Sequence, residues 1–265
     1  EYMVAAIMVS TGWSAYFVNL LNNLGIALPT RWIASPWDKT PGIINLPAVL
    51  IVLLLTGLLI RGVKESSRAN LVIVIIKVMI ILFFIVLAAP HVNPENWKPF
   101  MPFGFKGVMT SAAIVFLAFV GFDAVSTVAE ETVNPQRDMP VGIMGSLVVA
   151  TVLYIAVSAI MTGVVHYTKL NVADPVALVL NELHKPQASM VISLGALAGI
   201  TSVLLVLLMG QPRIFFSMSR DGLLPETFSR VHPRFKTPVT TTLLTGGVVA
   251  VAAGLTPINI SSELV

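Results

Sequence analysis

Long apolar runs dominate this chain, and short polar segments rich in charge, proline and glycine separate them. Each run is about long enough to cross the hydrocarbon core of a bilayer as a helix, which takes roughly 20 apolar residues. Alternation at period two, the mark of a membrane barrel strand, is missing, and open strands or coils could not satisfy their backbone hydrogen bonds in lipid. We therefore predict seven transmembrane helices, approximately at 1 to 22, 43 to 60, 70 to 89, 107 to 131, 139 to 165, 187 to 212 and 239 to 256.

Composition leads to the same class of protein. Hydrophobic residues make up 56% of the 265 residues and charged residues only 11%, which lies outside the usual range for a soluble domain. The net charge of +3 does not indicate a nucleic acid partner, because the basic residues lie in short loops rather than on one face. Cysteine is absent and the four histidines are scattered, so we expect no metal and no cofactor. The predicted fold class is all-α, a polytopic membrane helix bundle forming a single transmembrane domain over residues 1–265.

The basic residues in the loops predict an orientation. One set of alternate loops holds nine of them and the other set holds six. The bias comes mainly from the loops at 61 to 69 and 213 to 238, which we place in the cytoplasm. The proline-rich segments 30 to 41 and 94 to 105 are then external, with three expected interface anchors, Trp32, Trp37 and Trp97.

Two loop segments carry residues that end and start helices. Asp174 before Pro175 predicts the N-cap and first residue of a short external helix over 174 to 184. In the segment 134 to 140, proline is expected to end one helix and Asp138 to cap the next. Neither segment indicates catalysis.

Two charged residues interrupt the apolar runs. Lys77 lies in the run Leu71–Ala89, and Asp123 lies in the run Gly107–Ala129. A charge near the middle of a membrane span costs roughly 2.5 to 3.5 kcal/mol on insertion scales. Such residues mark functional sites by default, and the other long runs are almost free of charge. This pattern favours a small-molecule transporter.

Lys77 has two interpretations. The functional one is a fixed or titrating charge that stands where a transporter would otherwise bind sodium, with helix carbonyls or hydroxyls of neighbouring spans as acceptors. The alternative is a lysine whose stem reaches along the helix to the membrane interface.

The segment 116 to 123 also has two interpretations. Gly121, flanked by aromatic residues and followed closely by Asp123, is a plausible helix break, because glycine has low helix propensity and leaves the backbone open. The carbonyls exposed at such a break can bind a cation such as an α-ammonium group. A continuous helix with a packing glycine and a hydrogen-bonded Asp123 is equally compatible with the sequence.

The sixth predicted span contains small residues and two adjacent hydroxyls in the segment 195 to 202. Its GxxxG pattern usually means close helix contact. Thr201 and Ser202 can bond back to carbonyls of their own helix, which is the commoner arrangement in membrane helices. Proximity to Lys77 would instead give them a functional role.

Several motifs occur together in this chain: Glu1-Tyr2, Lys77, AFVGFD at 118–123, NPQRDMP at 134–140, SRDGLLP at 219–225 and VHPRFKTP at 231–238. Together they resemble the amino acid–polyamine–organocation superfamily of permeases, and the cationic amino acid transporter branch most closely. The resemblance covers essentially the whole chain. It implies part of a fold of two inverted five-helix repeats, in which the seven spans correspond to helices three to nine. With no initiator methionine at Glu1, we expect a fragment that lacks the first two and the C-terminal helices.

The resemblance also implies site residues. The residues around the helix break would bind the substrate, and backbone carbonyls there would bind its α-amino group. These residues are Leu117, Ala118, Phe119, Val120, Phe122 and Asp123. The side-chain pocket would be lined by Ser202 and Val206. The residues for proton coupling, or for replacing a sodium ion, would be Lys77, Thr201, Ser202 and Glu1.

The sequence and the resemblance together predict a secondary transporter of amino acids, proton-coupled and working by alternating access, with no catalytic residue. The expected partners are a small-molecule amino acid, protons and the lipid bilayer; an accessory membrane subunit is left open. We expect a multi-pass protein of the plasma membrane or cell inner membrane. The alternatives are an exchanger or uniporter of the same fold, and a non-transporting nutrient sensor.

Overall fold

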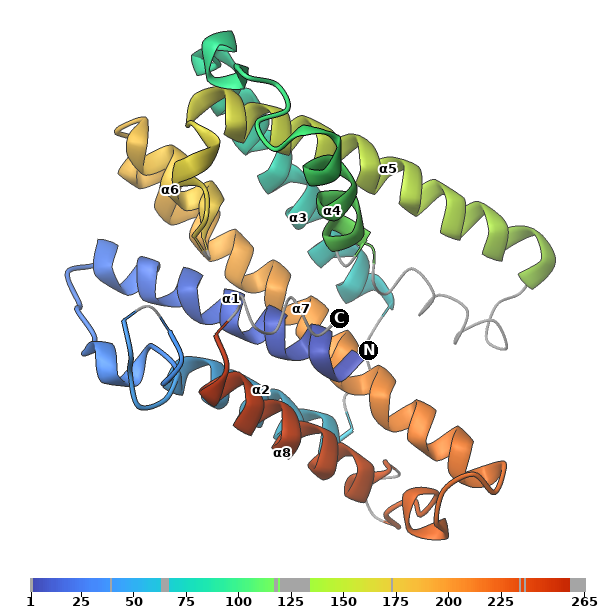
Figure 1. The fold of residues 1–265 in the computed structure, drawn as a ribbon. Helices are drawn as coiled ribbons and strands as arrows, with labels where there is room; N and C mark the ends of the chain where they lie inside the picture. Colours follow the sequence, from blue (N-terminus) through green and yellow to red (C-terminus); the bar gives the residue numbers. More distant parts are fainter. Residues whose placement is uncertain are drawn as a thin grey trace. The chain divides into compact units, whose positions relative to one another are not determined.

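The computed structural model describes residues 2–38, 40–62, 67–116, 119, 134–172, 174–233, 235 and 237–257, with the backbone alone for 67–70. All regular secondary structure in these ranges is helical (Figure 1). The elements are α1 (Tyr2–Asn23), η1 (Thr30–Trp32), α2 (Leu46–Ile60), α3 (Ser67–Ala88), η2 (Ala89–His91), η3 (Pro94–Trp97), α4 (Gly104–Phe116), α5 (Pro135–Val164), η6 (Tyr167–Lys169), α6 (Pro175–Glu182), α7 (Pro186–Arg220), η7 (Glu226–Phe228) and α8 (Val239–Leu255).

Each of the seven predicted spans overlaps a helix. The fourth, predicted at 107 to 131, does so as far as Phe116, and most of its remaining residues lie outside the described residues. Within the described residues, four helical segments are long and apolar enough to cross a membrane, namely α1, residues Leu71–His91 of α3 and η2, α5 and α7. Three shorter apolar helices, α2, α4 and α8, account for the other predicted spans. The structure confirms the prediction of an all-α membrane helix bundle.

Two helix ends differ from the predictions. We expected Asp138 to cap the fifth span, but α5 begins at Pro135 with Asn134 as its N-cap, so that prediction was wrong. The fixed φ of proline suits the first helical position, and Asp138 instead lies in the first turn, where a negative charge is favourable. We expected the sixth span to end near 212, whereas α7 continues through Pro212 to Arg220. Pro212 is buried, and tertiary packing there keeps the chain helical past a residue that normally ends helices.

The short helix between the fifth and sixth spans forms where the sequence placed it. α6 begins at Pro175, and Asp174 is its N-cap residue. Proline is well suited to this first position because the N–H it lacks would have no helical partner there.

The described helices form two compact units, and the boundary between them falls within α3 after Lys77. The first unit comprises residues 1–77 and 186–265. In it α1 packs along α7, and α2 packs along α8 (Figure 1). The pair α1 and α7 is antiparallel, since the Tyr2 ring lies beside Gly210 while Trp13 bonds to Thr201.

Asn45 joins three helices of the first unit. Its side-chain Oδ1 caps α2 by accepting from the Ala48 backbone N–H at 3.3 Å, and it also accepts from the Ser14 hydroxyl of α1 at 2.6 Å. Its backbone N–H donates to the Gly254 carbonyl of α8 at 2.9 Å. Buried polar groups need such partners where water is excluded. Asn45 therefore sets where the ends of α2 and α8 lie against α1.

The second unit comprises Val78–Lys185. Here η3 is attached to the C-terminal end of α5. The Trp97 indole N–H donates to the Ala159 carbonyl and to the Thr162 hydroxyl, both at 3.2 Å, and the Asn96 side chain donates to the Gly163 carbonyl at 2.8 Å. These bonds hold the segment that follows α3 against α5.

Candidate functional site

Lys77 points from α3 to α7. Its ammonium Nζ donates to the Ser202 hydroxyl at 3.0 Å, and the side chain is half-buried. The stem passes over Gly199, where a Cβ atom would lie 3.3 Å from the Lys77 Cγ and 3.4 Å from its Cε. The missing side chain of this buried glycine therefore makes room for the lysine. A lysine extended along its own helix to the interface is not the arrangement in this structure.

Thr201 and Ser202, the two hydroxyls expected to face the lysine, have different partners. The Thr201 hydroxyl donates to the Leu197 carbonyl of its own helix at 2.6 Å and accepts from the Trp13 indole N–H at 2.9 Å. The structure thus brings Lys77 and Ser202 together, while Thr201 makes the back-bond that the sequence offered as the alternative.

Trp13 is a residue that the sequence reasoning missed. It lies on α1, half-buried, and its ring stacks on Phe17 with centroids 5.0 Å apart. A signal was present, because a tryptophan inside an apolar span must find an acceptor for its N–H where water is absent. The sequence alone did not say which helix would supply that acceptor.

The described partner of Lys77 is neutral. The two ion pairs found in the described part of the chain, Lys98–Glu95 at 2.7 Å and Lys169–Glu182 at 3.3 Å, are both exposed and do not involve it. An ammonium can donate three hydrogen bonds, and Ser202 accepts one of them. The arrangement is a positive charge held by a hydroxyl at the contact between α3 and α7.

Two further predicted residues are described. Val206 lies on α7 one helical turn beyond Ser202 and is half-buried. Phe119 meets the Tyr154 ring of α5 edge to face, with centroids 5.3 Å apart. The other predicted site residues lie outside the described residues, and they are Glu1, Leu117, Ala118, Val120, Phe122 and Asp123.

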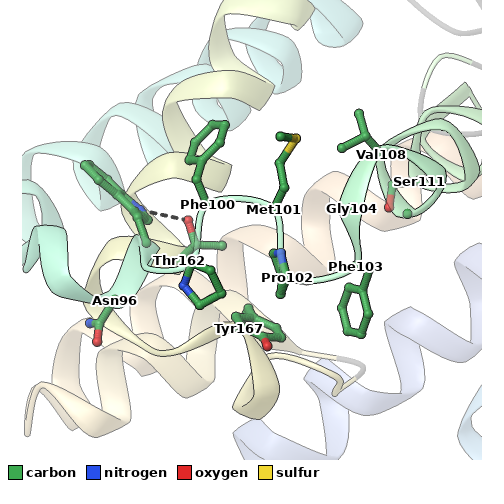
Figure 2. Close-up of a pocket in the computed structure, with 13 residues that line it drawn as sticks. Asn96, Phe100, Met101, Pro102, Phe103, Gly104, Val108, Ser111, Thr162 and Tyr167 are labelled. Atoms are coloured by element: carbon green, nitrogen blue, oxygen red, sulfur yellow. Dashed lines mark hydrogen bonds between the residues drawn. The ribbon is translucent and has the colours of Figure 1, made fainter.

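A cleft of about 370 Å³ lies within the second unit, between η3, the start of α4 and the end of α5 (Figure 2). Rings and prolines are prominent in its wall, including Phe100, Phe103 and Tyr167, and none of the described residues that line it is charged. None of the predicted site residues that the structure describes lies in the cleft.

Comparison with known proteins decides the family. A profile described as amino acid permease matches residues 1–264. The chain belongs to the amino acid permease family. This confirms the resemblance drawn from the motifs.

Three curated relatives show how varied the named members of this permease family are. It is 51% identical over 265 residues to the methylthioribose transporter of Bacillus subtilis and 49% identical over 268 residues to the branched-chain amino acid permease BcaP of that organism, and each match covers 100% of the chain and 58% of the relative. It is 42% identical over 238 residues to cationic amino acid transporter 9, chloroplastic, of Arabidopsis thaliana, covering 88% of the chain and 42% of the relative. The chain thus spans about half the length of these relatives.

Proposed function

We propose that the protein containing this chain is a secondary transporter that moves amino acids across a membrane by alternating access, coupled to protons. The observation that carries the proposal is the Lys77–Ser202 hydrogen bond at 3.0 Å, in a chain of the amino acid permease family. A lysine held by a hydroxyl between two membrane helices provides a positive charge without a bound sodium ion. No catalytic residue is involved, because transport breaks no bond.

Protonation of Lys77 offers a physical basis for coupling. With its proton, the side chain bonds to Ser202 and ties α3 to α7; without it, the charge at this contact is lost. A hydrogen bond to a charged group contributes roughly 1.5 to 3 kcal/mol, which amounts to about a tenfold to hundredfold change in a two-state equilibrium if the bond exists in only one state. Protonation would then shift the population between outward-open and inward-open forms.

The substrate site follows from the family pattern. The carbonyls of Leu117, Ala118 and Val120 would receive the α-amino group, with Phe119 and Phe122 as packing or gating rings. Asp123 would lie beside the helix break, and Ser202 with Val206 would line the side-chain pocket. Glu1 would take part in proton coupling beside Lys77 and Thr201.

The names of the relatives suggest which classes of substrate to compare. Names of relatives include a methylthioribose transporter, a branched-chain amino acid permease and a cationic amino acid transporter. The family description and two of these three names support an amino acid. A substrate panel therefore needs a cationic, a small and a branched amino acid together with methylthioribose.

The test is uptake of labelled arginine, alanine, leucine and methylthioribose by the full-length parent protein in proteoliposomes, with and without an inward proton gradient. We expect a gradient to stimulate uptake of at least one amino acid, and Lys77→Ala to abolish that stimulation. An uptake rate that changes with neither the gradient nor the substitution would contradict proton coupling and favour an exchanger or uniporter. Counterflow experiments would then measure exchange directly. Absence of uptake of every compound would favour a nutrient sensor that keeps the fold. Labelling of intact cells would test the expected plasma membrane location.

A further inference from the structure

The Trp13 side chain is directed at the hydroxyl next to the lysine site. Its indole N–H donates to the Thr201 Oγ1 at 2.9 Å, across the contact between α1 and α7. The ring is stacked on Phe17 of the same helix, with an angle of 14° between the planes. Stacking restrains the ring, so the N–H stays aimed at α7.

Thr201 has two available orientations in a helix. Threonine divides between two χ1 rotamers because its hydroxyl can bond the carbonyl either three or four residues earlier. In this structure Oγ1 bonds the carbonyl four residues earlier, that of Leu197, at 2.6 Å. The carbonyl three residues earlier belongs to Ala198, which lies one turn before Ser202 on the same side of α7. The second rotamer would therefore turn the hydroxyl toward the side that holds Lys77.

The bond from Trp13 selects between these rotamers. It is available only while the Thr201 oxygen points toward α1, which is the Leu197 side. We propose that Trp13 is a positioning residue of the Lys77 site, which keeps Thr201 turned toward α1 and leaves Ser202 as the hydroxyl that receives the ammonium. This inference rests on the proposed role of Lys77, and it adds α1 to the helices that determine how the charge is held.

The described side chains of α1, α3 and α7 include no carboxylate. The ionisable side chains on α1 and α7 are Tyr2, Tyr16, Arg213 and Arg220, and the described side chains of α3 add none besides Lys77 itself. None of these is a carboxylate. Among the described groups, hydroxyl acceptors are therefore what can hold the ammonium, and Glu1, proposed above for coupling, lies outside the described residues.

The experiment measures the pH of half-maximal uptake in proteoliposomes of the full-length parent, using the amino acid it transports best. Trp13→Phe keeps a ring on Phe17 and removes only the N–H. Thr201→Val removes the hydroxyl at nearly constant shape, and the double variant combines both. Trp37→Phe is the matched control, because Trp37 is 73% exposed and lies away from the site.

We expect Trp13→Phe to raise the pH of half-maximal uptake by about one unit, because a freed Thr201 becomes a second acceptor for the ammonium. Trp37→Phe should leave it unchanged, whereas Thr201→Val alters a residue of the proposed coupling site and is the reference for the double variant. The double variant should match Thr201→Val alone, since the hydroxyl on which Trp13 acts is no longer present. A purely structural role for Trp13 predicts instead that Trp13→Phe adds its own effect to that of Thr201→Val.

Two results would overturn the inference. These are a Trp13→Phe profile equal to that of Trp37→Phe, or a double variant whose pH of half-maximal uptake differs from that of Thr201→Val. If Trp13→Phe fails to fold, Trp13→Leu, which also removes the N–H, replaces it in the single and the double variant. Absence of uptake by the unmodified parent would instead overturn the proposed function, and this inference with it.

Discussion

Three neighbouring residues of α7 determine how the Lys77 side chain is held. Ser202 accepts its hydrogen bond, Gly199 leaves space for its stem, and Thr201 is engaged elsewhere. The space is as necessary as the acceptor, because a Cβ on Gly199 would be at 3.3 Å from the lysine stem. Gly199 therefore belongs to the candidate site even though it offers no side chain.

At the residue scale we predict that Gly199→Val removes gradient-stimulated uptake nearly as fully as Lys77→Ala, by about tenfold or more, since the branched side chain displaces the lysine from Ser202. Gly142→Val is the matched control, because a Cβ at Gly142 meets nothing within 4 Å. Uptake and thermal stability are measured for both variants, each made in the full-length parent protein and purified. A fully coupled Gly199→Val variant would show that the glycine does not determine the position of the lysine.

Close packing of α2 on α8 depends on small residues. A Cβ added to Gly246 of α8 would overlap the Thr56 side chain of α2, which is buried and bonds its own Val52 carbonyl at 2.7 Å. Threonine is stiff at χ1 and cannot easily move aside. The neighbouring Gly247 has nothing within 4 Å of an added Cβ.

At the element scale, these adjacent glycines predict opposite effects of the same substitution. Gly246→Ala should destabilise the parent by about 1 to 3 kcal/mol through overpacking. Gly247→Ala should leave the free energy of unfolding unchanged or raise it by roughly 0.5 to 1 kcal/mol, because alanine is the better helix former. The midpoint of thermal unfolding in detergent compares the two variants. Equal midpoints would mean that α2 and α8 do not pack as described.

The orientation of the bundle in the membrane is a property of the whole molecule. The chain has no cysteine, so single cysteines can report it. Phe100 precedes α4 in a segment we expect outside and is 87% exposed, whereas Arg230 lies in the loop between α7 and α8, which we expect inside, and is also exposed.

At this scale we predict that a membrane-impermeant maleimide labels Phe100→Cys in intact cells and labels Arg230→Cys only after the membrane is opened. The parent is first freed of any other cysteine, and labelling of both variants in lysed cells serves as the control for reactivity. The reverse pattern would show that the modest excess of basic residues in the loops misplaced the cytoplasmic side.

Hydropathy along the sequence determined that the apolar runs are helices and, outside the fourth span, gave their approximate limits, because the cost of exposing backbone to lipid is local and forces apolar runs into helices. It also singled out Lys77, since a charge in an apolar span stands out without any structure, while the role of Ser202 depended on whether it lay near Lys77. Helix ends were less certain, and the start of α5 at Pro135 shows how one proline shifted a cap.

Tertiary structure decided which partners these residues meet. The periodicity of α7 puts Thr201 and Ser202 on adjacent sides, but only the packing of α1 on that helix and the reach of Lys77 from α3 assign Trp13 to one hydroxyl and Lys77 to the other. Buried Pro212 remains helical for the same reason. Such choices depend on contacts between residues far apart in the chain, where the fit of side chains outweighs local preference, and the local pattern of the sequence does not contain them.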